Sequence, residues 1–159
     1  MQVLTQCRDH IIRRTFEAVK GAPRAVIHFY NSTSVAQREQ VFHKSKEEIK
    51  KIATDGAKLV KQLSEEYEGN FLFEYSPESF TGTEVDYAVD VCNAVLDIMQ
   101  PTPDRPIDHQ PAGHRGMSIA QCVCQPDRLR QAPEYRDSVI ISTHPTTPRH
   151  RRGLRRAWP

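Results

Sequence analysis

Five side chains that could bind a substrate or move a proton follow apolar segments of this sequence. His28 lies in the apolar run 25–30, Glu74, Ser76 and Glu78 lie in or just after 71–75, and His144 ends the run 138–144. Imidazole, carboxylate and hydroxyl groups act as acids, bases and hydrogen-bond partners of polar substrates. When they follow buried parallel strands, they meet at the carboxyl edge of the sheet, where barrel enzymes carry out their chemistry.

Amphipathic helices separate these apolar segments. Apolar residues recur at helical spacing over 9–20, from 45 to about 68, and over 85–99. We expect Asp9 to cap the first helix, a capping box at 45–48 (SKEE) to open the second, and a box at 81–84 (TGTE) to open the third. A short strand at 3–4 precedes the first helix. Up to residue 99 the chain therefore alternates three strands (3–4, 25–30 and 71–75) with three helices.

Apolar strands joined by amphipathic helices indicate a parallel sheet that is buried on both faces. No glycine-rich phosphate loop follows any strand, which disfavours a nucleotide-binding doubly wound fold. Polar groups at successive strand ends favour a barrel instead. Beyond residue 107 the pattern fails: no strand is evident in 108–116, where the spacing requires one, and no helix in 121–133.

Composition also changes along the chain. Of 159 residues, 38% are hydrophobic and 26% charged, as in an ordinary globular protein. Residues 1–107 hold 13 Lys+Arg and 16 Asp+Glu, whereas 108–159 hold 9 Arg, no Lys and 4 acids. No apolar run could cross a bilayer and no signal peptide is evident at the start, so we expect a cytoplasmic protein with reduced cysteines and no membrane partner.

Long strings of this sequence resemble the catalytic barrel of the 2-isopropylmalate synthases. They are VLTQCR at 3–8, GAPRAVIHFYNSTS at 21–34, IATDGAKLV at 52–60, FEYSPESFTGTE at 73–84, PTPDRPI at 101–107 and RDSVIISTHP at 136–145. The resemblance implies a partial TIM (β/α)8 barrel, roughly its third to seventh strands. It divides the chain into a partial catalytic barrel domain at 1–107, a degraded segment at 108–135, a barrel strand at 136–145 and a disordered Arg-rich tail at 146–159.

The resemblance also implies an activity. Members of this family are acyltransferases of leucine biosynthesis, which condense acetyl-CoA with 2-oxoisovalerate at a divalent metal ion (Zn, Mg or Mn) and form homodimers. On the matching positions, His28 is a contact of the 2-oxo acid, Ser76 and Glu78 are further substrate-binding residues, and His144 is the first metal ligand. Glu74 is interpreted as a structural partner within the strand rather than as a catalyst.

The chain departs from the family pattern after residue 107. Thr146, Thr147 and Pro148 stand where the metal motif His-x-His-Asn-Asp requires its second His, Asn and Asp. The segments 108–116, 121–132 and 148–158 can each be encoded by bases that, read one position over, give the family's residues. Our hypothesis is that the chain is an internal, frameshifted fragment of such an enzyme. It keeps the substrate-binding residues His28, Ser76 and Glu78, does not retain the metal ion, and has no condensation activity alone.

Alternative functions remain open. Homocitrate or citramalate synthases would share much of this pattern, although HFYNSTS and SPESFTGTE favour the leucine enzyme. A non-enzymatic protein could bind nucleic acid or an acidic partner through 149–156, but arginine-rich peptide is also what shifted GC-rich coding sequence yields, which disfavours a nucleic-acid role. A third possibility is a fragment completed by another chain.

Overall fold

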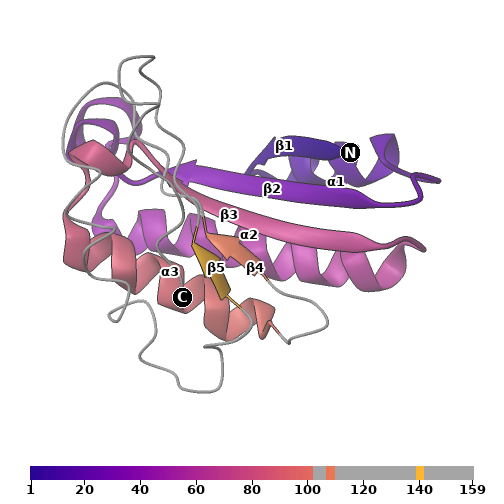
Figure 1. The fold of residues 1–159 in the computed structure, drawn as a ribbon. Coiled ribbons are helices and arrows are strands. Elements are labelled where there is room, and N and C mark those ends of the chain that lie inside the picture. Colours follow the sequence, from indigo (N-terminus) through magenta and orange to yellow (C-terminus); the bar gives the residue numbers. More distant parts are fainter. Residues whose placement is uncertain (102–106, 110–138, 142–159) are drawn as a thin grey trace, which may run out of the picture.

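A computed structural model describes residues 1–101, 107–109 and 139–141. Its elements alternate as the periodicity predicts (Figure 1): β1 (Gln2–Gln6), α1 (Asp9–Ala18), β2 (Ala25–Ser32), α2 (Lys46–Glu66), β3 (Phe71–Glu78), α3 (Val85–Met99), β4 (Ile107–His109) and β5 (Val139–Ile141). A π-helix, η1 (Gln37–Phe42), and a 3-10 turn, η2 (Phe80–Gly82), lie in the two loops that follow β2 and β3.

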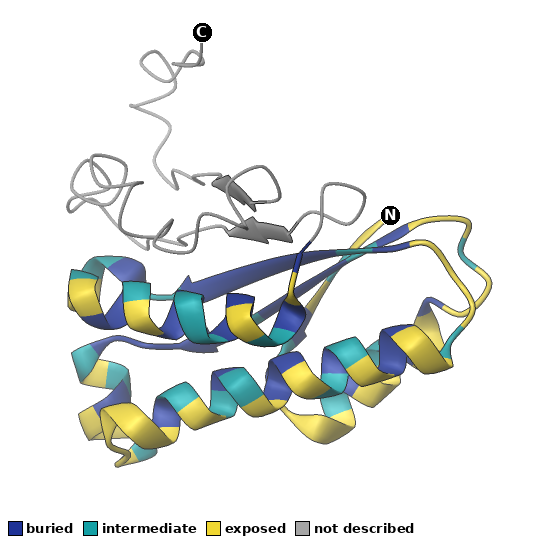
Figure 2. Cartoon of the chain, turned by 90° about the horizontal axis from the view of Figure 1, so that it is seen from below, coloured by how far each residue is buried: buried dark blue, intermediate teal, exposed yellow. Residues whose placement is uncertain are grey.

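The five described strands form one parallel sheet in the order β1-β2-β3-β4-β5. Doubly wound sheets reverse their strand order, whereas consecutive right-handed crossovers in a single direction place every helix on the same face. Figure 2 shows α2 and α3 along one side of the strands, with their exposed faces turned outward. This arrangement confirms the prediction of a partial α/β barrel.

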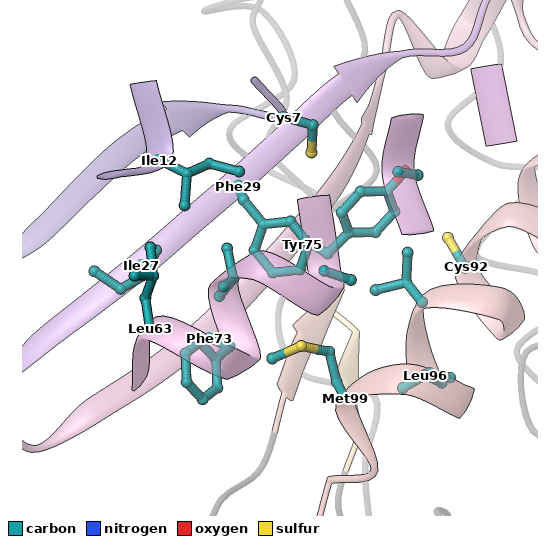
Figure 3. Packing of buried hydrophobic residues seen from close by; sticks show 14 of the residues in the cluster. Cys7, Ile12, Ile27, Phe29, Leu63, Phe73, Tyr75, Cys92, Leu96 and Met99 are labelled. Atoms are coloured by element: carbon teal, nitrogen blue, oxygen red, sulfur yellow. The ribbon is translucent and has the colours of Figure 1, made fainter. Parts of the chain in front are cut away.

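The core lies between that face of the sheet and the helices. Ile27 and Phe29 of β2 pack with Phe73 and Tyr75 of β3 beneath the helices (Figure 3). The Phe29 and Tyr75 ring centroids are 5.2 Å apart. All four side chains are at most 8% exposed, and burying each contributes roughly 2 kcal/mol to the stability of the fold.

Gly56 brings α2 close to the end of β1. A Cβ atom at this position would lie 2.8 Å from Sγ of Cys7. The Cys7 thiol, which is 6% exposed, fills the space that a side chain at position 56 would need, and burial raises its pKa to about 12. The absence of a side chain at Gly56 therefore sets the separation of this helix from the sheet.

The helix starts confirm one predicted cap and correct two. Ser45 accepts from the Glu48 amide, and the Glu48 carboxylate accepts from the Ser45 amide, so the capping box of α2 is confirmed. Asp9 is not the cap of α1: the extended Arg8 holds that position, and the Asp9 carboxylate accepts from Arg13 Nε at 3.0 Å.

The predicted capping box at 81–84 is also wrong. Glu84 itself is the N-cap of α3 and makes no side-chain cap hydrogen bond. Its carboxylate accepts instead from Arg38, which the sequence places 46 residues earlier. Two charge-assisted hydrogen bonds from a guanidinium are stronger than a single one from a backbone amide. The Glu84 carboxylate therefore binds Arg38 instead of capping the helix.

Both long strands continue further than predicted. β2 runs to Ser32 and β3 to Glu78, so Ser76 and Glu78 belong to the strand and not to the loop after it. A strand is also present at Ile107–His109, where Phe73, Glu74 and Tyr75 are its register partners. The interpretation that 108–116 contains no strand is therefore corrected for residues 108 and 109, while 110–116, 121–133 and 146–159 lie outside the described part. No helix in that part is long and apolar enough to cross a membrane.

Candidate functional site

One face of the sheet is polar, and it is the face turned away from the helices. Alternate residues of a strand share a face, so His28, Tyr30 and Ser32 lie on one side of β2, and Glu74, Ser76 and Glu78 on the same side of β3. The register pairs these residues directly: His28 with Glu74, Tyr30 with Ser76, and Ser32 with Glu78. In a closed barrel this face lines the interior, and its carboxyl end forms the site.

A chain of polar contacts crosses three strands on this face. His28 Nε2 lies 2.7 Å from Ser76 Oγ, and His28 Nδ1 lies 3.3 Å from Glu74 Oε1. The second carboxylate oxygen, Glu74 Oε2, accepts from Gln2 Nε2 of β1 at 2.5 Å. His28 is 9% exposed, Glu74 5% and Ser76 1%, so these polar groups are held by one another rather than by solvent.

A second polar pair lies one step nearer the carboxyl end. Ser32 Oγ donates to Glu78 Oε2 at 2.5 Å, and the Glu78 carbonyl accepts from the Thr33 amide at 3.1 Å. Ser32 also lines a cavity of about 290 Å³ between the ends of β1 and β2 and the start of α2. Gln6, Arg8 and Lys44 border this cavity as well, so it offers cations and amides beside the polar face.

The imidazole of His28 is neutral at physiological pH. Burial lowers its pKa to about 4 because a desolvated ring holds a second proton less readily. A neutral imidazole has one N–H donor and one lone pair. It can therefore accept a proton or bind a polar ligand, but it does not present a fixed positive charge.

Arg38 of η1 fixes the loop that borders the site. Its Nη1 and Nη2 donate to the two carboxylate oxygens of Glu84 at 2.9 and 2.8 Å. Nη1 also donates to the Thr33 carbonyl at 2.6 Å, and the guanidinium lies 4.9 Å from the centre of the Tyr87 ring. The guanidinium beside Glu84 lowers the pKa of that carboxyl to about 2, so the clamp is charged at any physiological pH.

The described residues contain no group of three His, Cys, Asp or Glu side chains arranged to hold a metal ion. His144, the metal ligand that the resemblance implies, lies outside the described residues. Its role therefore stays a prediction.

Three of the four predicted site residues come together. His28 and Ser76 are in contact, and Glu78 follows two positions along the same face. The sequence reasoning missed two members of this face, Gln2 and Ser32, and gave Glu74 only a structural role. The alternation of strand residues could have identified Ser32 and Glu74. In two extended strands, positions 28, 30 and 32 share one face, and so do positions 74, 76 and 78.

Most of this chain is similar to known proteins. A family model described as HMGL-like matches residues 1–123. The chain is 52% identical to a 2-isopropylmalate synthase of Desulfitobacterium hafniense over 146 residues, which are 91% of this chain and 26% of that protein. It is 54% identical over 145 residues to the enzyme of that name from Bifidobacterium longum subsp. infantis, covering 90% of this chain and 23% of the relative. The chain thus spans about a quarter of the length of the curated relatives it matches.

Proposed function

The chain belongs to the HMGL-like family, and we propose that it forms the 2-oxo-acid wall of a 2-isopropylmalate synthase site. The complete reaction joins acetyl-CoA, 2-oxoisovalerate and water into 2-isopropylmalate and CoA. The observation that carries the proposal is the convergence of His28, Ser76 and Glu78 on one face at the carboxyl ends of β2 and β3. High identity to relatives named for this reaction supports it.

The reaction needs a bond between the acetyl methyl carbon and the keto carbon of the 2-oxo acid. That methyl group must first lose a proton, and the thioester must then be hydrolysed. His28, Ser76 and Glu78 would hold the 2-oxo acid in a fixed orientation toward the incoming methyl carbon. Such positioning can lower the barrier by several kcal/mol, about two or more powers of ten in rate. Burial strengthens each of these contacts, because competing water is absent.

A divalent ion (Zn, Mg or Mn) would polarise the ketone and stabilise the negative charge that forms on its oxygen. Because the described residues contain no three-ligand group, we assign no step of the reaction to an ion on this chain. With Thr146 in place of the second histidine of the metal motif, we propose that the isolated chain has no condensation activity. Three further parts of the proposal come from the resemblance. They are a barrel domain at 1–107, a cytoplasmic location and assembly into a homodimer.

A chimera tests the proposed substrate-binding residues separately from the parts of the enzyme that the relative supplies. Residues 1–101 replace the matching segment of the Desulfitobacterium hafniense relative, and CoA release is followed with acetyl-CoA and each of three 2-oxo acids. We expect turnover with 2-oxoisovalerate over pyruvate and 2-oxoglutarate, the substrates of citramalate and homocitrate synthesis. His28→Ala, Ser76→Ala and Glu78→Gln should each lower kcat/KM by about 100-fold.

Val26→Ala is the matched control for these variants. Val26 lies on the same face of β2, two residues before His28 and toward the amino end, where barrel enzymes do not carry out chemistry. It should change kcat/KM by less than about threefold. An active chimera whose three site variants behave like Val26→Ala would refute the proposal. Metal-dependent CoA release by the unmodified chain would refute the claim that it is inactive alone.

A further inference from the structure

We propose that the cavity between the ends of β1 and β2 and the start of α2 binds the oxyanion group of a small ligand, a carboxylate or a phosphate carried on a short apolar chain. Arg8 and Lys44 neutralise the charge of this group, and Asn31 donates a hydrogen bond to one of its oxygen atoms. The cavity lies among the described residues, and it does not depend on the role proposed above for the polar face of the sheet.

The lining of this cavity carries two positive charges. Arg8 and Lys44 line it, and no Asp or Glu of the described residues does so. This balance is the reverse of that in residues 1–107 as a whole, which hold 13 Lys+Arg and 16 Asp+Glu. Two cations without a carboxylate beside them in the lining attract an anion, because each lowers the energy of a negative charge placed near it.

Both cations are available to a ligand. Arg8 is exposed at the N-cap of α1 and makes no ion pair within the part of the chain that the structure describes. Its guanidinium has a planar pair of N–H groups that matches the oxygens of a carboxylate or a phosphate. Lys44 Nζ lies 3.4 Å from Glu48 Oε1 in an exposed pair. Such exposed pairs contribute little to stability, so the ammonium can also bind a ligand.

A buried hydrogen-bond donor lines the same cavity. Asn31 is 5% exposed, and its Oδ1 accepts from the Tyr75 hydroxyl at 2.7 Å. One N–H of its amide makes a long bond of 3.4 Å to the Ile49 carbonyl. The amide has a second N–H, for which the described residues provide no acceptor. A buried N–H without an acceptor costs free energy, and an oxygen of a bound ligand removes that cost.

Apolar side chains form much of the remaining lining and limit the kind of ligand. Phe42, Ile49 and Ile52 contribute to it, and the cavity holds about 290 Å³. Pockets for organic ligands usually start at about 300 Å³, so this one is small. It fits an anionic group on a short aliphatic chain and is too small for a nucleotide.

The loop after β2 holds one wall of the cavity in place. The Lys44 amide donates to the Arg38 carbonyl at 2.9 Å, which closes the π-helical turn that carries Phe42. The Arg38 guanidinium in turn binds Glu84 at the start of α3. This wall is therefore formed before a ligand arrives, which lowers the entropy that binding must overcome.

NMR of the full chain provides a local measurement of binding. The chain has three asparagines, Asn31, Asn70 and Asn93, and of these Asn31 lines the cavity. Labelling the asparagine side chains with ¹⁵N gives three NH2 signals, which Asn70→Ser and Asn93→Ser assign. The probes are butyrate, butyl phosphate and the uncharged butyramide.

We expect at least one of the two anions to shift the Asn31 signal to saturation, while the other two asparagine signals stay in place. The anion with the lower half-saturation concentration identifies the group as carboxylate or phosphate. Butyramide has the same chain without the charge and should give no saturable shift. No saturable shift with either anion, or equal binding of butyramide, would overturn the proposal.

The double variant Arg8→Gln with Lys44→Gln tests the two cations. Both side chains are exposed, so the fold should persist, which circular dichroism checks. The half-saturation concentration should rise by about fivefold or more at low salt, because two attractive charges are lost. Lys20→Gln with Arg24→Gln is the matched control. It removes the same charge from exposed positions at the amino end of β2 and should change the value by less than about twofold.

Ile52→Phe tests the location without changing any charge. The larger side chain fills part of the cavity, so the shift of the Asn31 signal should disappear with both anions. Binding that persists in this variant, or equal weakening in the two double variants, would place the anion elsewhere and refute the proposal. These spectra need no turnover, so their failure is separate from a failure of the chimera to condense acetyl-CoA with 2-oxoisovalerate.

Discussion

Lowering the pH from 7.5 to 5 should weaken the fold through His28. The unfolded chain holds this imidazole with a pKa near 6.5, whereas burial lowers the value to about 4 in the fold. Between these two values the unfolded state binds more protons, so stability falls as the pH falls. The contribution is fully present above about pH 6.5 and is lost as the pH approaches 4.

The magnitude follows from the difference of the two pKa values. Each pKa unit corresponds to about 1.4 kcal/mol, so the whole shift is worth about 3 kcal/mol. At pH 5 about 2 kcal/mol of that amount is already lost. The depressed pKa of Glu84, about 2, contributes in the same sense but mainly below pH 4.5, so it stays outside this window.

Urea unfolding of the full chain, followed by circular dichroism at pH 7.5 and pH 5, measures the effect. His28→Gln is the matched control, because its amide can still bond Ser76 and Glu74 but does not titrate. We expect the wild type to lose about 2 kcal/mol more than this variant between the two pH values. Equal losses in the two proteins would refute the reasoning, since His28 would then titrate alike in the folded and unfolded states.

Three further substitutions test the packing around the site, all by urea unfolding at pH 7.5. Arg38→Met removes the two guanidinium bonds to Glu84, but this carboxylate is 41% exposed and keeps Lys46 Nζ at 3.0 Å, so the change should cost about 1.5 kcal/mol; a loss below about 0.5 kcal/mol would show that this clamp adds nothing. Gly56→Ala sets a Cβ 2.8 Å from Sγ of Cys7 and should cost about 2 kcal/mol through overpacking, whereas neutrality would mean that α2 shifts freely. Thr5→Val removes a buried hydroxyl that has no hydrogen-bond partner among the described residues and should raise stability by about 1 kcal/mol; a loss instead would indicate a partner for that hydroxyl.

The sequence is sufficient to predict the elements whose signals are local. Period-3.6 apolar positions predicted α2 and α3, and Ser45 with Glu48 predicted the start of α2, because a capping box needs only neighbouring residues. Gly21, with φ +82°, lies in the turn after α1, in a conformation that glycine adopts without strain.

The failures have long-range causes. Glu84 looks like part of a capping box until Arg38, from the loop after β2, takes its carboxylate. Glu74 looks like a strand residue until the register of two parallel strands places it opposite His28. Parallel pairing joins residues separated by a whole helix, so no local pattern can show which carboxylate will face which imidazole.

The thiol of Cys7, beside Gly56, provides a chemical probe of motion at this position. The buried thiol has a pKa about three units above its usual value, so its reactive thiolate is depleted about a thousandfold at neutral pH. Cys7 also lines the cavity between the ends of β1 and β2 and the start of α2, so a small alkylating reagent approaches this sulfur from that cavity. The rate at which Cys7 is modified therefore reports how readily this cavity admits a reagent beside α2, and the rate at Cys92, 4% exposed in α3, reports how often α3 moves away from its neighbours.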